Sequence, residues 1–401
     1  MAKQNKPAIR FKGFTDAWEQ RKLSEIAGKV TEKNTGLQYV ETLTNSAEFG
    51  IISQRDFFDH DISKLGSLDG YYIVRNEDFV YNPRISTSAP VGPINRNKLG
   101  RTGVMSPLYT VFRPHDIDTT YLEHFFKCGY WYSFMNFNGD SGARSDRFSI
   151  KDDVFFQMPI PVPHIEEQRK IGLFLTQLDH LITLHQRKYD KLQVLKKAML
   201  EKMFPKNGSS VPEIRFKGFT DAWEQRKLGE VFEEYSEKNH EELPPLTIIQ
   251  GGGTIRRDES ERSLQYDKSS LSNYKMVNKD DFIVHLRSFE GGLEKANSQG
   301  IISPAYHTFH GENVDSRFYY AYFRSKNFIN KDLKPHVYGI RDGRSIDIEG
   351  MKTIKIPCTS YAEQKSIGDF LTTLDHLITL HQRELEKLQN IKKSMLEKMF
   401  V

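Results

Sequence analysis

The sequence predicts an α+β protein built from two tandem domains, each followed by a long helix. The segment Phe174–Phe204 returns as Phe370–Phe400 with 24 of 31 positions identical. The segment Ile9–Leu23 returns letter for letter as Ile214–Leu228. Self-similarity on this scale indicates an internal duplication. Between the repeated segments, short strand-like runs and helical stretches are separated by Gly, Pro and Asn turns, which is typical of an α+β domain.

The two long repeated segments are predicted to be amphipathic helices. Apolar residues recur at alternating spacings of three and four, as at Ile171, Leu175, Leu178 and Ile182. This spacing places them on one stripe and suits a coiled-coil seam. A helix of about 38 residues is roughly 57 Å long, and spacing alone does not set whether two such helices run parallel or antiparallel. Ser360 with Glu363 fits a capping box at the second start.

The repeats divide the chain into segments. A polar linker, PKNGSSVP, separates the two copies. The predicted order is a first domain at 1–165, a helix at 166–204, the linker at 205–212, a second domain at 213–360 and a helix at 361–401.

Composition indicates an ordinary soluble protein. The 401 residues are 38% apolar and 27% charged, with a net charge of +4. No apolar run reaches membrane-span length, the N-terminus lacks a signal-peptide core, and the two cysteines have no metal or redox spacing. We therefore expect a cytoplasmic protein without a membrane partner, and the mild positive charge permits a nucleic-acid partner without requiring one.

The middles of the two copies have diverged far more than the repeated segments. Strands are expected at 71–74, 78–81 and 109–112, and helices at 121–137 and 317–328. Near-identical ends suggest that both copies meet the same partner surface. The divergent segments between the repeats suggest that each copy binds a different ligand.

The chain resembles the specificity subunits of bacterial type I restriction-modification systems along essentially all of its length. The resemblance rests on the twin helical repeats, the repeated AWEQRKL opening, the Gly-[Val/Ile]-[Met/Ile]-Ser-Pro-x-Tyr segment and the order domain–helix–domain–helix. It implies two target recognition domains that each read half of a split site on double-stranded DNA, and two helices packed as an antiparallel coiled coil. It also implies two methyltransferase subunits docked on the repeated segments, with restriction subunits joining through them.

Candidate DNA-binding residues follow from side-chain chemistry. Gly-led loops with two arginines can present guanidinium groups to phosphates or guanine edges, and arginines that follow strand-like runs can do the same. The polar and aromatic neighbours of these arginines are candidates for base contacts. The candidates are Arg144, Arg147, Arg341, Arg344, Arg84, Arg287, Tyr81, Asn82, His285, Ser141 and Tyr338. Salt bridges or solvated loops are the alternative roles for the arginines, and Gly251–Gly253 is either a DNA-backbone loop or a flexible turn.

Candidate partner-binding residues are the large apolar side chains of the repeated segments, for which packing in the core is the alternative. They are Trp18, Leu23, Trp223, Leu228, Phe174, Leu181, Phe370 and Leu377. The repeated lysines of the helices, such as Lys196 and Lys392, either form a basic flank, or are solvated or paired with Glu201 and Glu397.

An enzymatic role is not supported by any motif. The sequence contains no phosphate-binding Gly-rich loop, and Asn82-Pro83-Arg84 lacks the aromatic residue of the amino-methyltransferase signature. We therefore expect a non-catalytic subunit without a cofactor or metal. A DNA-binding regulator without a modification partner and a scaffold that binds only protein are the competing hypotheses.

Overall fold

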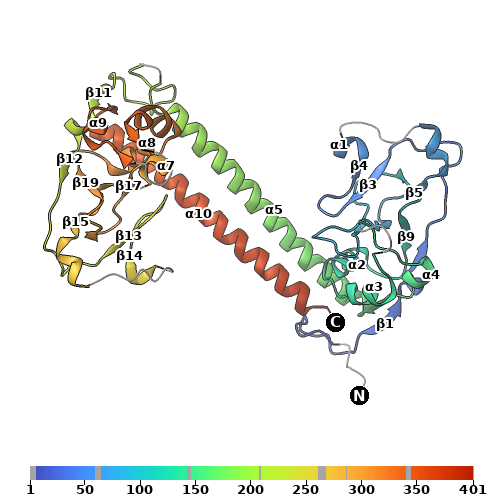
Figure 1. The fold of residues 1–401 in the computed structure, drawn as a ribbon. Helices are drawn as coiled ribbons and strands as arrows, with labels where there is room; N and C mark the ends of the chain where they lie inside the picture. Colours follow the sequence, from blue (N-terminus) through green and yellow to red (C-terminus); the bar gives the residue numbers. More distant parts are fainter. Residues whose placement is uncertain are drawn as a thin grey trace. The chain divides into compact units, whose positions relative to one another are not determined.

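The computed structural model describes residues 6–58, 65–141, 146–206, 209–260, 268–285, 287–339 and 345–400. The chain divides into two compact units (Figure 1), which we describe separately. Unit 1 contains Met1–His185 and Glu384–Val401, and unit 2 contains Gln186–Arg383. Each unit therefore combines one diverged middle with parts of both long helices.

Unit 1 is a mixed fold around a four-stranded sheet. The sheet has the order β2-β9-β6-β7, and three two-stranded sheets pair β1 with β10, β3 with β4 and β5 with β8. All of these pairings are antiparallel. The strands are β1 Glu19–Lys22, β2 Ala27–Lys29, β3 Leu43–Ser46, β4 Gly50–Ser53, β5 Tyr72–Val74, β6 Phe79–Tyr81, β7 Ile94–Arg96, β8 Gly103–Met105, β9 Thr110–Pro114 and β10 Pro159–Val162. The helices are η1 Leu23–Glu25, α1 Gln54–Phe58, η2 Leu65–Gly70, α2 Thr119–Lys127, α3 Tyr132–Asn138, α4 Asp152–Phe155 and the long α5 Ile165–Lys202.

Unit 2 repeats this topology. Its four-stranded sheet has the order β12-β19-β16-β17, and β11–β22, β13–β14 and β15–β18 match the pairs of unit 1, while β20–β21 is a further pair. The strands are β11 Glu224–Lys227, β12 Glu233–Tyr235, β13 Leu246–Ile249, β14 Gly253–Arg256, β15 Lys275–Val277, β16 Phe282–Val284, β17 Glu294–Lys295, β18 Gly300–Ile302, β19 His307–His310, β20 Val337–Tyr338, β21 Ser345–Ile346 and β22 Lys355–Cys358. The helices are α6 Leu228–Val231, η3 Arg257–Glu259, η4 Lys268–Asn273, α7 Ser288–Gly291, α8 Ser316–Phe323, η5 Phe328–Leu333, η6 Lys334–His336, α9 Ile348–Lys352 and the long α10 Tyr361–Lys398.

The expected elements are largely confirmed. Both long helices are unbroken over 38 residues, and the three strands expected in the first copy appear as β5, β6 and β9. Two expectations are wrong, because neither 317–328 nor 121–137 is a single helix: α8 ends at Phe323 and η5 begins at Phe328, and 121–137 is divided as well. It forms α2 and α3, and Gly129, with φ of 76°, lies between them in a conformation that favours glycine.

The long helices α5 and α10 pack together and run antiparallel (Figure 1). In unit 2, Lys196 of α5 forms a salt bridge with Asp375 of α10. In unit 1, Lys392 of α10 forms the equivalent salt bridge with Asp179 of α5. The same two repeat positions are therefore paired in both units, and these lysines pair with the facing helix rather than with Glu201 and Glu397. No helix in the described part of the chain has both the length and the apolar character that crossing a membrane requires.

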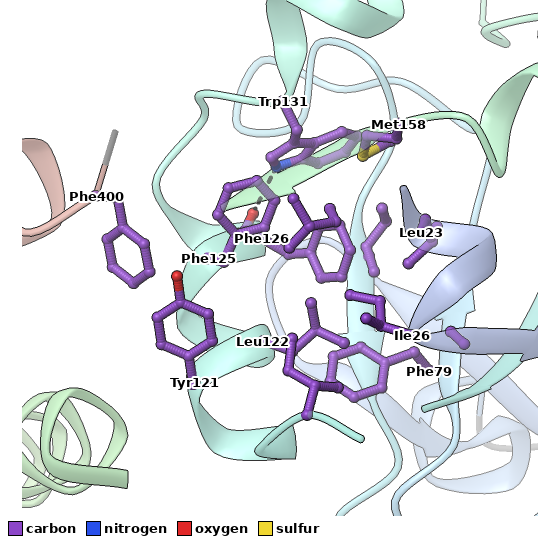
Figure 2. Packing of buried hydrophobic residues seen from close by; sticks show 14 of the residues in the cluster. Leu23, Ile26, Phe79, Tyr121, Leu122, Phe125, Phe126, Trp131, Met158 and Phe400 are labelled. Carbon is purple, nitrogen blue, oxygen red and sulfur yellow. Dashed lines mark hydrogen bonds between the residues drawn. The ribbon is translucent and has the colours of Figure 1, made fainter. Parts of the chain in front are cut away.

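An aromatic cluster forms the core of unit 1 and includes the end of α10 (Figure 2). Phe400 lies against Tyr121 and Phe125, with ring centroids 5.5 and 6.1 Å apart. In unit 2 the end of α5 is held in the same way, because Phe204 packs on Phe318 and Tyr322 at 5.0 and 5.5 Å. In each unit, the residue two positions past the end of the long helix from the other copy therefore packs into the core.

A buried histidine in unit 1 gives a pH-dependent prediction. His124 is 1% exposed, and burial, followed by the charge of Lys127, lowers its pKa to about 3. An unfolded histidine has a pKa of about 6.5. Below that pH, His124 binds a proton in the unfolded chain but not in the folded one. The free energy of unfolding therefore falls as the pH falls. Between pH 7 and pH 5 this histidine should cost roughly 2 kcal/mol or less.

The variant His124→Ala tests this, since Ala321 occupies the same position in unit 2. Urea titrations at pH 7, 6 and 5 should show a shallower fall in the unfolding free energy for the variant than for the wild type. Because the two slopes are compared, any constant loss from the smaller side chain cancels. Equal slopes would mean that folding does not lower the pKa of His124.

Candidate nucleic-acid interface

The end of strand β6 brings two of the predicted arginines together in unit 1. Arg84 and Arg147 form an isolated antiparallel bridge, fixed by the backbone bonds from Phe148 N–H to the Pro83 carbonyl at 2.8 Å and from Ile85 N–H to the Asp146 carbonyl at 3.0 Å. The Arg84 side chain is 70% exposed, and its contact to Asp146 is 3.5 Å long. An exposed guanidinium in a weak surface pair loses little when it turns to a phosphate.

Two other candidates beside Arg84 have structural roles. Tyr81 is 3% exposed, stacks on Phe155 at 5.0 Å and donates its hydroxyl to the Val91 carbonyl at 2.9 Å. Burial raises its pKa well above the usual range. Tyr81 therefore lies in the core in this conformation, and its contact with DNA stays a prediction.

Asn82 is half-buried and has both ends of its amide occupied. Its Nδ2 donates to the Asn45 carbonyl at 2.7 Å, and its Oδ1 accepts from the Arg84 N–H at 3.0 Å. Asn45 belongs to the β3–β4 hairpin, so Asn82 links that hairpin to the Arg84 loop. These bonds give Asn82 a positioning role at the candidate surface, and its contact with a base stays a prediction.

The corresponding region of unit 2 differs in chemistry. His285 follows β16 where Asn82 follows β6, and its Nδ1 accepts from the Arg287 N–H at 3.3 Å. Burial, followed by the charges of Arg324 and Arg287, lowers the pKa of His285 to about 4. The imidazole is therefore neutral at physiological pH. Arg287, next to it, is exposed at the start of α7.

The remaining DNA candidates are only partly described. Ser141 is exposed beside the bridge between Asp140 and Ser149. Tyr338 is 59% exposed on strand β20. Arg144, Arg341 and Arg344 lie outside the described residues, so their predicted role stays a prediction.

The glycine cluster of unit 2, Gly251–Gly253, forms the turn between β13 and β14 and is fixed by hydrogen bonds to Glu294. Glu294, which is fully buried, accepts from the Gly251 N–H at 2.7 Å and from the Gly253 N–H at 3.1 Å. The same carboxylate accepts from the Tyr320 hydroxyl at 2.8 Å and is paired with Arg324. Two of the turn's N–H groups thus bind a carboxylate of the protein, so they are not free for a DNA phosphate.

Most of the predicted partner-binding residues are internal. Four of them are at most 3% exposed and lie in the core, as the alternative role has it: Trp18, Leu23, Trp223 and Leu228. Their role in docking stays a prediction. Phe174 and Phe370 are half-buried, and they pack edge-on against Phe11 and Phe216, each at 5.8 Å. Leu181, 43% exposed, and Leu377, half-buried, are the candidates that still offer surface.

The repeated N-terminal motif is anchored by an ion pair at the start of each long helix. Arg10 donates to both oxygens of Glu167 at 2.6 and 2.7 Å. Arg215 donates to both oxygens of Glu363 at 2.7 and 2.8 Å. Their side chains are at most 14% exposed. Fixed bidentate pairs of this kind demand the same residues in both copies, which explains part of the sequence identity without a partner.

An exposed aromatic patch in unit 1 was missed by sequence reasoning. Phe49, at the turn of the β3–β4 hairpin, is 60% exposed, and Phe57 and Phe58 of α1 are 41% and 38% exposed. The rings of Phe49 and Phe57 lie 6.2 Å apart. The sequence could have indicated this patch, because the three phenylalanines stand beside turn residues and do not follow a periodicity that predicts burial.

The fold and these surfaces define a protein with two copies of one recognition fold, which carry different side chains at equivalent positions. The chain belongs to the type I restriction modification DNA specificity domain family, whose model matches residues 15–194 and 220–390. This is the family that the sequence resemblance implied.

Similar proteins agree with this assignment. The chain is 26% identical over 266 residues to the type I restriction enzyme MjaVIII specificity subunit of Methanocaldococcus jannaschii, covering 62% of each chain. It is 25% identical over 262 residues to the MjaX specificity subunit named for the same organism, covering 62% of this chain and 60% of that protein. The type I restriction-modification S subunit of M. genitalium has the same fold, with a TM-score of 0.57, 14% identity and 99% coverage of both chains.

Proposed function

We propose that this subunit recognises a split, asymmetric site on double-stranded DNA and directs methyltransferase and restriction subunits to it. Unit 1 would bind one half of the site and unit 2 the other. The restriction subunits would join through two methyltransferase subunits. The subunit itself would be non-catalytic.

The difference between the two units at equivalent positions supports this proposal most strongly. The sheets have the same order, yet Asn82 is replaced by the neutral His285, and the hairpin turn that carries Phe49 is replaced by the turn held by Glu294. Conserved scaffolds with different side chains at the sheet end are suited to recognising different base sequences, because specificity comes from contacts to base edges.

Mapping of adenine methylation tests the proposal. A cell that carries this chain with its methyltransferase should show methylated adenines in two short sequences separated by a fixed spacer. Methylation of an unsplit motif would contradict two-unit recognition. Failure of the chain to co-purify with a methyltransferase would favour the regulator, and absence of sequence preference in the assembled complex would favour the protein-only scaffold.

The exposed arginines give a prediction on affinity. Arg84→Ala and Arg287→Ala should each weaken DNA binding and reduce the slope of log affinity against log salt by about one, as expected for one lost phosphate contact. Fluorescence anisotropy with a cognate duplex over a range of salt concentrations measures this. Arg169→Ala is the control, because Arg169 is 61% exposed on α5 and outside the diverged middles. A salt slope unchanged in both variants would remove these arginines from the interface.

A further inference from the structure

A basic pocket lies at the end of α5 in unit 2. It has a volume of about 480 Å³. Leu200, Phe204, Pro205 and Tyr322 supply apolar lining. The lining also includes five cationic side chains and one carboxylate, and these are Lys196, Lys197, Lys206, Arg324, Lys326 and Glu201. Three of these cations, Lys196, Arg324 and Lys206, are paired with carboxylates of the protein. The exposed Lys197 and Lys326, beside the apolar lining, are the cations that suit an acidic ligand with an apolar group.

In unit 1, the position that corresponds to this pocket is filled by the side chain of Tyr130. The hydroxyl of Tyr130 donates to the Glu397 carbonyl, in the last turn of α10, at 2.6 Å. A helix leaves its final carbonyls without intrahelical partners, and the tyrosine satisfies one of them.

The equivalent position in unit 2 is Asn327. The correspondence follows from the neighbouring rings, because Trp131 packs on Phe126 in unit 1 as Phe328 packs on Phe323 in unit 2. Asn327 lines the pocket, and its side chain is shorter than that of tyrosine.

The helix end is also different in unit 2. Glu201 occupies the repeat position of Glu397 and lines the pocket. The residue four positions further on is Pro205, which has no N–H to give to the Glu201 carbonyl. The pocket therefore combines apolar side chains with two exposed lysines, at the place where unit 1 inserts a tyrosine.

We propose that this pocket binds a tyrosine side chain carried by an acidic segment of a methyltransferase subunit, an inference that rests on the proposed function. The tyrosine would take the place that Tyr130 takes in unit 1 and donate to the Glu201 carbonyl. Lys197 and Lys326, both exposed, would face the acidic neighbours of that tyrosine. Because Tyr130 fills the corresponding place in unit 1, the two units would hold their methyltransferase subunits with unequal strength.

The test uses the full-length chain and its purified methyltransferase in isothermal titration. The wild type should show two non-equivalent binding events. Asn327→Tyr should fill the pocket from within, and Lys326→Glu should repel the acidic segment. Each should weaken one event by about tenfold or more and leave the other unchanged. Tyr130→Asn in unit 1 is the matched control and should not weaken either event.

The other outcomes separate the alternatives. If both pocket variants titrate as the wild type does, the inference is overturned and the proposed function stands. If Lys326→Glu weakens DNA binding by the subunit alone while the methyltransferase titration is unchanged, the occupant is a DNA phosphate and the inference is again overturned. If the wild type binds no methyltransferase, the proposed function itself is overturned, and the inference with it. Lys326 is exposed, so its variant tests the pocket even if Asn327→Tyr fails to fold.

Discussion

Replacing Glu363 by alanine should lower the free energy of unfolding by about 3 kcal/mol or more. The Glu363 side chain is 1% exposed and holds Arg215, which is 12% exposed. It also accepts from the Trp223 indole N–H at 3.0 Å and from the Thr359 hydroxyl. The variant would leave a guanidinium and an indole N–H buried without this partner, and unsatisfied buried groups carry the full cost of desolvation. Urea denaturation followed by circular dichroism measures the loss.

The control is Glu166→Ala on α5. Glu166 and its partner Arg169 are 57% and 61% exposed, and an exposed pair of this kind contributes well under about 1 kcal/mol. The double variant Arg215→Met with Glu363→Met should recover much of the stability, because it removes both charges together. If Glu363→Ala were as mild as Glu166→Ala, the ion pair would not be what anchors the repeated motif to the helix.

The same glutamate shows where sequence reasoning was limited. The capping box predicted for Ser360 and Glu363 is half formed, since the Glu363 N–H lies 3.4 Å from the Ser360 hydroxyl. The carboxylate instead binds Arg215, which is 148 positions away in the sequence. Local spacing predicts local bonds, and it carries no information about a partner brought in by the tertiary fold.

Periodicity and duplication were the parts that the sequence predicted well. The long helices, the repeat and several strands follow from spacing over a few residues, and all were confirmed. Burial of individual side chains did not follow from the sequence. Tyr81 lies on a central strand whose three residues are all buried, and Trp18 lies just before an edge pair that folds over the core. A polar-tipped aromatic suits a surface or a core equally well, so residue type could not decide between them.

The proximity of Arg84 and Arg147 in the candidate site also depends on a long-range contact. Arg84 and Arg147 come from separate motifs, and their bridge is set by how the 146–149 backbone pairs with the residues after β6. The sequence indicated both arginines as candidates, but it could not show that they are neighbours. The corresponding pair in unit 2 would be Arg287 and Arg344, and Arg344 lies outside the described residues.

Exchange of one diverged middle should change half of the methylated motif completely. We expect a chimaera that takes residues 30–157 from another family member to read a new first half-site and to retain the second. The boundaries follow from the structure. Strands β1 and β10 stay paired, and the pair of Arg10 with Glu167 is kept. The anchoring of the motif is therefore native in the chimaera.

Mapping of methylated adenines measures the outcome, and the reciprocal exchange of residues 236–353 in unit 2 is the matched control. Each mismatched base pair costs about 1–3 kcal/mol of binding, so the original first half-site should lose its methylation rather than share it. A change in both halves of the motif would show that the two units do not read DNA independently. Retention of both original halves would place the reading surface in the repeated segments, where the two copies are nearly identical and a split, asymmetric site could not arise.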